Sequence, residues 1–146
     1  MTFYRRPTKL TRAFNRFVSW LASLGFTPRD TVTLEAKGRS SGRVRSTVII
    51  WVEHEGERYF VSPRGEAEWV RNVRAAGGEA VTHRRGRQTV RLEEVPAEER
   101  APIIKAYLKK TARATQQHFG VEPKAEIGEF EGIAARHPVF RIVTVD

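Results

Sequence analysis

The amino-acid sequence predicts a mainly β protein of the α+β class, in which about six mostly antiparallel strands form a small barrel with three peripheral helices. Segments of β-type alternation cluster in the middle of the chain, short turns containing Gly join them as hairpins, and helical periodicity is confined to three segments. Hairpins favour antiparallel pairing, and a small barrel is an economical way to pack such strands.

The expected strands are short and are separated by turns. The segment TVTLEA alternates polar and apolar residues, which is typical of a strand with one buried face. The segment VIIWV is apolar at every position, which is typical of a central strand covered on both faces. Strands are expected at 31–36, 43–53, 58–62, 79–83, 87–95 and 139–145.

Helical periodicity marks residues 8–24, 66–76 and 97–116, and Pro96 stands where the third helix is expected to open. Residues 117–138 are rich in Gly, Pro and Glu, so we expect an irregular segment there. Its length suggests a lid or wall for a substrate.

We expect one domain over residues 1–146, with an N-terminal helix within 1–27 and the barrel with its other helices in 31–146. The N-terminal helix has an aromatic face opposed by arginines, so docking on the barrel, covering a ligand and lying on a membrane surface are all open. No segment is long enough to span a bilayer. A cytoplasmic location is therefore expected, with peripheral membrane association as the alternative.

Composition narrows the classes of ligand. The chain has no cysteine, and its four histidines show no zinc-binding spacing, so no metal site is expected. The formal net charge is +9, and four cations with no acid lie in 37–45 and again in 84–91. Such a field attracts phosphates, polycarboxylates, nucleic acid or acidic lipid head groups.

The segment KGRSSGRVRST places a polar, cationic turn before the apolar strand. Gly38 and Gly42 permit a tight turn whose amides converge on an anion. Two serine hydroxyls add donors, and the arginines Arg39, Arg43 and Arg45 can bind phosphate or carboxylate oxygens through two nitrogens each. The turn is therefore a candidate anion site, and the alternative is a basic hairpin tip exposed to solvent.

Three motifs in order resemble the deazaflavin-dependent nitroreductase family, whose members are split β-barrel proteins that use coenzyme F-420. They are GRSSGRVR at 38–45, VSPRG at 61–65 and WVRN at 69–72. The resemblance covers residues 31–95, and HPVFRIV at 137–143 is similar to the closing strand of the family. The coenzyme carries a phosphate and a run of glutamates, which fits the basic charge of this chain.

The resemblance also implies a set of residues that bind the cofactor. Arg39, Ser40, Ser41 and Arg45 would hold the phosphate and the proximal tail. Residues 46–50 would lie along the deazaflavin ring, namely Ser46, Thr47, Val48, Ile49 and Ile50.

Two further pairs complete the predicted site. Arg64 and Gly65 would close one side, while Trp69 and Asn72 would face the coenzyme from one side of a helix. Trp69 has an alternative as a core anchor, and Asn72 has one as a bridge to the backbone. No catalytic residue is assigned.

The implied activity is hydride transfer from the reduced deazaflavin to an electron-poor small molecule, such as a quinone, an activated alkene or a nitro compound. The chain has no tyrosine after Tyr107, where better-known nitroreductase members carry a proton donor, so nitro reduction is doubtful. The alternatives are a split-barrel flavoprotein that binds FMN and a basic nucleic-acid-binding domain. We expect no nucleic-acid partner, and a homodimer is common among barrels of this type.

Overall fold

The computed structural model describes residues 16, 19, 20, 22, 23, 25, 30–84 and 86–145. The helix expected at 8–24 lies mostly outside these described residues. Six strands occupy the predicted segments to within one or two residues: β1 (Thr31–Lys37), β2 (Val44–His54), β3 (Glu57–Val61), β4 (Glu79–His83), β5 (Arg87–Glu94) and β6 (Val139–Thr144).

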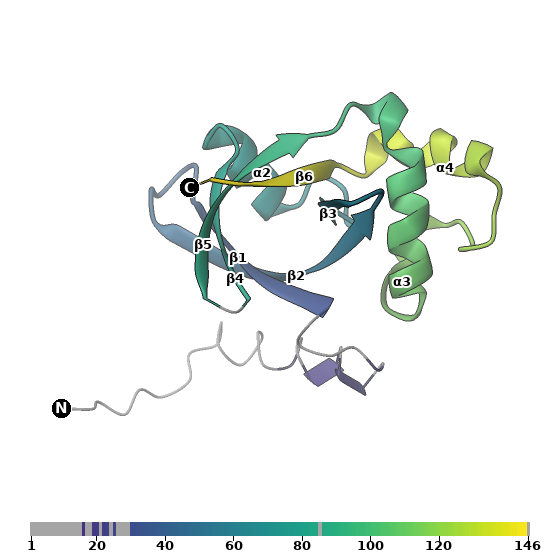
Figure 1. Cartoon of the computed structure of the whole chain (residues 1–146), viewed down its shortest axis with the longest axis horizontal. Coiled ribbons are helices and arrows are strands. Elements are labelled where there is room, and N and C mark those ends of the chain that lie inside the picture. Colours follow the sequence, from purple (N-terminus) through teal and green to yellow (C-terminus); the bar gives the residue numbers. More distant parts are fainter. Residues whose placement is uncertain are drawn as a thin grey trace.

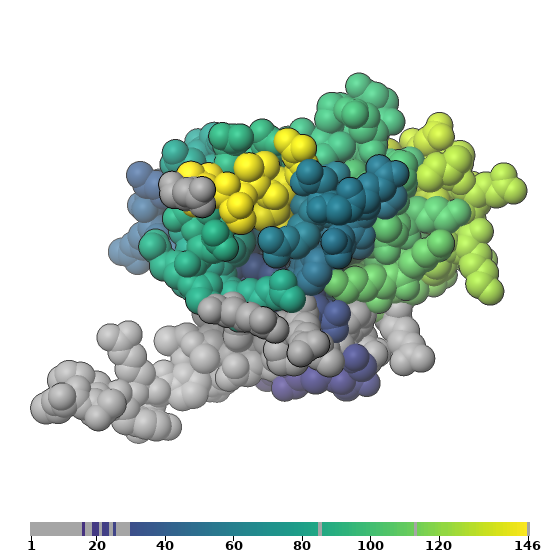
Figure 2. Space-filling view, viewed as in Figure 1, coloured from purple at the N-terminus to yellow at the C-terminus, as the bar shows by residue number. Residues whose placement is uncertain are grey.

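The six strands form a closed barrel in the order β1-β2-β3-β6-β5-β4, and every pairing is antiparallel (Figure 1). Figure 2 shows β3 and β6 side by side on one face of the molecule, with residues 101–133, coloured green to yellow-green, at one end. The predicted fold class is confirmed.

Strand β2 separates two hydrophobic cores because its side chains alternate between the two faces of the sheet. Ile49 and Trp51 pack with the core inside the barrel, which the helix α2 (Glu68–Ala75) completes with Val70 and Val73. Side chains on the other face of β2, such as Ile50, pack against the helix α3 (Ala101–Phe119). Double coverage explains why this strand is apolar on both faces.

The prediction of an irregular segment at 117–138 is wrong. Helix α3 continues to Phe119, and the helix α4 (Ile127–Ile133) and the 3-10 turn η3 (Ala134–Arg136) follow it. Phe130 is fully buried against the α3 side of the core. Burial of this kind contributes more than the roughly 1 kcal/mol that each glycine of IGEFEGI costs a helix.

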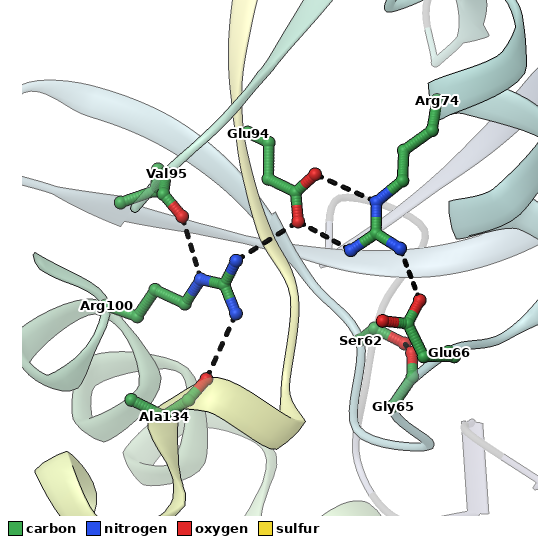
Figure 3. Close-up of polar contacts among 8 residues, drawn as sticks. All are labelled: Ser62, Gly65, Glu66, Arg74, Glu94, Val95, Arg100 and Ala134. Atoms are coloured by element: carbon green, nitrogen blue, oxygen red, sulfur yellow. Dashed lines mark hydrogen bonds and ion pairs between the residues drawn. The ribbon is translucent and has the colours of Figure 1, made fainter. Parts of the chain in front are cut away.

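Ion pairs and hydrogen bonds join these elements beside the barrel (Figure 3). The Glu94 carboxylate of β5 accepts hydrogen bonds from Arg74 of α2, at 2.9 and 2.6 Å, and from Arg100, at 3.1 Å. Arg100 follows the 3-10 turn η2 (Ala97–Glu99), is buried, and also donates to the carbonyl oxygens of Val95 and Ala134. The network fixes α2, α3 and η3 to one end of β5.

Candidate functional site

A cavity of about 1140 Å³ lies where the β1–β2 turn, β2, the segment after β3, α2 and α3 meet. Of the thirteen cofactor-binding residues that the sequence predicts, twelve line this cavity: Arg39, Ser40, Ser41, Arg45, Ser46, Thr47, Val48, Ile49, Ile50, Arg64, Trp69 and Asn72. Residues from separate predicted motifs therefore share one space.

The β1–β2 turn is closed by its own backbone. The Gly38 amide donates to the Arg43 carbonyl oxygen at 2.7 Å, and the Gly42 amide donates to the Gly38 carbonyl oxygen at 2.9 Å. Gly42 has a φ of 71°, which favours glycine, and a Cβ on Gly38 would lie 3.0 Å from both the Arg43 carbonyl oxygen and Ser41 Oγ. The two glycines thus permit the turn that the sequence predicts.

Asn72 anchors this turn to helix α2. Its side-chain oxygen accepts hydrogen bonds from the Arg39 amide at 3.1 Å and from Arg39 Nη1 at 2.9 Å, and Asn72 is buried. Arg39 Nη1 also lies 2.8 Å from Glu68 Oε2. The alternative interpretation of Asn72, a bridge to the backbone, is therefore confirmed, and the Arg39 guanidinium already has protein partners.

Three other arginines give the cavity its positive charge: Arg43, Arg45 and Arg64 all line it. Among the described residues no carboxylate lies within ion-pair distance of any of them. Glu68 also lines the cavity, but the Arg39 hydrogen bond lowers the pKa of its carboxyl and keeps the charge paired. The guanidinium groups of Arg43, Arg45 and Arg64 are therefore suited to bind a polyanionic ligand.

The segment after β3 forms a compact turn. Ser62 Oγ donates to the Gly65 carbonyl oxygen at 2.6 Å, and the ring nitrogen Nδ1 of buried His137 lies 3.1 Å from the Ser62 carbonyl oxygen. A Cβ on Gly65 would lie 3.0 Å from the Arg136 carbonyl oxygen, so Gly65 lets two backbone segments approach closely. Gly65 is the predicted site residue that is absent from the cavity lining, whereas Arg64 beside it is present.

Trp69 contacts the barrel core as well as the cavity. Its ring centroid lies 6.4 Å from that of Phe60 and 5.6 Å from that of Phe140. The core-anchor interpretation of Trp69 is therefore confirmed. Its predicted contact with the coenzyme stays a prediction.

Helix α3 supplies a wall that the motifs do not reveal. Tyr107, Ala114, Thr115 and His118 line the cavity, and their spacing along the helix places them on one side. None of the three sequence motifs contains Tyr107 or His118. Only the helical spacing could have indicated that these residues share a face. Burial raises the pKa of Tyr107, so its phenol stays protonated and cannot act as a base near neutral pH.

The residues present fit the coenzyme that the motifs imply. A phosphate and glutamates need cations that are not already paired. Arg43, Arg45 and Arg64 line the cavity and, in the described ranges, have no carboxylate within ion-pair distance. A planar ring needs an extended apolar wall, and Val48 and Ile50, which share the face of β2 that is turned toward α3, supply it. The assignment of individual contacts remains a prediction.

The described part of the chain contains no group of three or more side chains suited to hold a metal ion. Within the same residues, no helix is both long and apolar enough to cross a bilayer.

Comparisons with solved structures show where this fold recurs. Protein Atu2129, of unknown function, from Agrobacterium tumefaciens str. C58 is 15% identical with a TM-score of 0.57, over 80% of this chain and 48% of that one. This chain thus spans about half the length of that protein. An F420-H2 dependent reductase (FDR-A) is 20% identical with a TM-score of 0.53, over 78% and 94% of the two chains.

A third similar structure is the conserved hypothetical protein Rv2991 from Mycobacterium tuberculosis. It is 16% identical with a TM-score of 0.52, over 99% of this chain and 87% of that one. At these identities the likeness shows a shared fold. A search of curated proteins finds no match.

The sequence itself matches a family model over residues 8–123, and the family is described as F420H(2)-dependent quinone reductase. The match covers well over half of the 146 residues and includes the β1–β2 turn, β2, α2 and α3. The predicted use of coenzyme F-420 is thereby confirmed, while the family is described by quinone rather than nitro reduction. The protein belongs to this quinone reductase family, a family of oxidoreductases whose cofactor is coenzyme F-420.

Proposed function

We propose that this protein reduces a small quinone with reduced coenzyme F-420, and that the 1140 Å³ cavity is the site of the reaction. One observation carries the proposal: an arginine-rich turn and an apolar strand meet in one cavity. Within the described part of the chain, Arg43 and Arg45 of this turn have no carboxylate at ion-pair distance. The family supports reduction of a quinone, and activated alkenes and nitro compounds are the less favoured acceptors.

Arg43, Arg45 and Arg64 would hold the phosphate and glutamates of the coenzyme, together with the hydroxyls of Ser40 and Ser41. Arg39 would act mainly by fixing the turn, because its guanidinium already donates to Asn72 and Glu68. Residues 46–50 would support the ring. When bound, the reduced deazaflavin supplies the hydride.

The α3 wall would receive the acceptor. The cavity volume of about 1140 Å³ exceeds the roughly 300–1,000 Å³ of a pocket for one small ligand, so a quinone ring has room beside the coenzyme. Ala114 and Tyr107 offer apolar surface there, and His118 offers an imidazole. We assign His118 as the group that gives a proton to a quinone oxygen while hydride reduces the ring, which yields the hydroquinone.

The experiment is steady-state oxidation of reduced F-420 by a soluble naphthoquinone, followed by the absorbance of the oxidised coenzyme. Turnover that saturates in both reactants is expected, and His118→Asn should lower kcat more than KM and alter the pH profile. Tight binding of FMN or an oligonucleotide with no response to F-420 would contradict the proposal. Turnover with a nitroarene or an activated alkene but no quinone would contradict the acceptor alone.

A peripheral membrane contact and a homodimer both remain proposals. Many quinones dissolve in lipid, so we infer that contact with a membrane surface would bring the protein close to its acceptor. Vesicle sedimentation and size-exclusion chromatography test the two proposals separately.

A further inference from the structure

A second cavity, of about 280 Å³, lies at the other end of the barrel. Strand β1 runs between the two ends: Ala36 lines the larger cavity and Val32 lines the smaller one. Among the described residues, the two cavities share no lining residue.

We call the smaller cavity the lumen mouth, because it lies where the interior of the barrel opens. All six strands contribute inward-facing side chains to it. Its apolar walls come from Val32, Trp51, Phe60, Val90 and Ile142, whose strand pairings place them on the inner face of the barrel. Polar side chains stand nearer the rim: Thr82, Gln88 and Thr144. The interior is therefore apolar, with hydroxyl and amide groups at its entrance.

Three exposed arginines surround the entrance: Arg58, Arg84 and Arg87. Glu53 is the cross-strand neighbour of Arg58, yet no carboxylate in the described ranges lies within ion-pair distance of these three arginines. Elsewhere on the barrel Arg74, Arg91, Arg100 and Arg141 all pair with glutamates. Three cations therefore meet at the lumen mouth without a carboxylate partner among the residues that the structure describes.

Trp51 connects the apolar wall to the cationic rim. The Arg84 guanidinium carbon lies 4.8 Å from its ring centroid, and Lys110 Nζ lies 4.3 Å from it. Lys110 Nζ also donates to the Trp51 carbonyl oxygen at 2.5 Å and lies 3.7 Å from Asp30 Oδ1. These contacts hold the indole in place and leave the Arg84 side chain over an aromatic face at the entrance.

We propose that the lumen mouth is a second ligand site, which takes a small organic oxyanion. The volume of about 280 Å³ is slightly below the roughly 300–1,000 Å³ of pockets for drug-sized ligands, so it accommodates about one ring or a short chain. The apolar body lies along the wall that Trp51 and Ile142 help to form, and the carboxylate, sulfonate or phosphate group stays among the rim arginines. This proposal does not depend on the proposed reaction.

The test is a titration of isotope-labelled protein with phenyl phosphate at about 0.15 M salt, followed by NMR. Saturable shifts are expected for the Thr82 and Gly86 amides and for the Trp51 indole. Arg84→Gln/Arg87→Gln should raise the dissociation constant at least about tenfold, since two charge-assisted contacts are lost. Inorganic phosphate should bind more weakly than phenyl phosphate, because it leaves the apolar lumen empty.

The matched control is Arg71→Gln/Arg91→Gln, which removes two charges from exposed positions that line neither cavity. Its dissociation constant should stay within about twofold of the wild-type value. Equal weakening in both double variants, shifts that never saturate, or shifts confined to the larger cavity would overturn the second site. Equal binding of phenyl phosphate and inorganic phosphate would overturn the role of the lumen.

Discussion

Asn72 shows how one buried side chain shapes the site. Its oxygen is the acceptor for both the Arg39 amide and the Arg39 guanidinium, although the two residues are 33 positions apart in the chain. The WVRN motif therefore positions the GRSSGRVR turn, in addition to any contact with a ligand. The order of the motifs in the sequence did not show that WVRN is hydrogen-bonded to the GRSSGRVR turn.

We expect Asn72→Ala to lower the free energy of unfolding by about 1–3 kcal/mol, because the Arg39 amide loses its acceptor in a partly buried position. Urea denaturation measures the change. Asn72→Asp keeps an acceptor oxygen and should lose clearly less stability. An Asn72→Ala protein as stable as the wild type would show that the turn does not depend on this anchor.

The Glu94 network predicts a pH dependence. Hydrogen bonds from Arg74 hold the pKa of Glu94 below its ordinary value of 4.5, against partial burial and with help from Arg100. A carboxyl whose pKa is lower in the folded state contributes stability above its unfolded pKa and loses this contribution as the pH falls through the folded value. Glu94→Gln should therefore be destabilised at neutral pH by about 1 kcal/mol, after allowance for solvent screening.

The difference in unfolding free energy between wild type and Glu94→Gln should shrink as the pH falls below about 4.5. Denaturation curves at a series of pH values measure it. Glu98→Gln is the matched control, because Glu98 is exposed and forms no ion pair with any described residue. A constant difference across the pH range would contradict the assigned role of Glu94.

At the scale of elements, α4 depends on burial rather than on helix propensity. Phe130 has an exposed fraction of 0%, whereas Ile127 in the same helix is 42% exposed. Phe130→Ala should lower the free energy of unfolding by about 3–5 kcal/mol, and Ile127→Ala should change it by less than about 0.5 kcal/mol. Thermal and chemical denaturation test both. Similar effects at the two positions would contradict the packing of α4.

The same contrast explains what the sequence could predict. Strands and hairpins depend on alternation and turn residues that are close in the chain, so all six strands were predicted. Helix α4 was not, because IGEFEGI has two glycines and its stability comes from contacts with α3, which local patterns do not show. Tertiary packing outweighed propensity there.

The candidate site divides in the same way. The residues of the β1–β2 turn and β2 are consecutive in the chain, so a motif could indicate them as a group. The α3 wall comes from residues more than fifty positions further on, and no motif connects His118 or Thr115 to β2. Only the folded chain brings these two groups to the same cavity.

At the scale of the whole molecule, the barrel has two ends with different charge arrangements. The larger cavity combines Arg43, Arg45 and Arg64 with an apolar strand and the α3 wall, and the lumen mouth combines Arg58, Arg84 and Arg87 with Trp51. Both clusters contribute to the net charge of +9. The second basic segment, residues 84–91, contributes Arg84 and Arg87 to the lumen mouth, and none of its described residues lines the larger cavity.

The most direct measurement is the dissociation constant of coenzyme F-420 for the wild type and for Arg43→Gln/Arg45→Gln, beside a fragment that lacks the phosphate and glutamates. In the double variant the binding free energy of F-420 should become less favourable by about 1.5–3 kcal/mol or more. The affinity for the fragment should stay nearly unchanged, because only the phosphate and glutamates contact these arginines. Arg71→Gln/Arg91→Gln, of equal charge, should affect neither ligand. Unchanged F-420 affinity in Arg43→Gln/Arg45→Gln, or equal loss for F-420 and the fragment, would contradict the account.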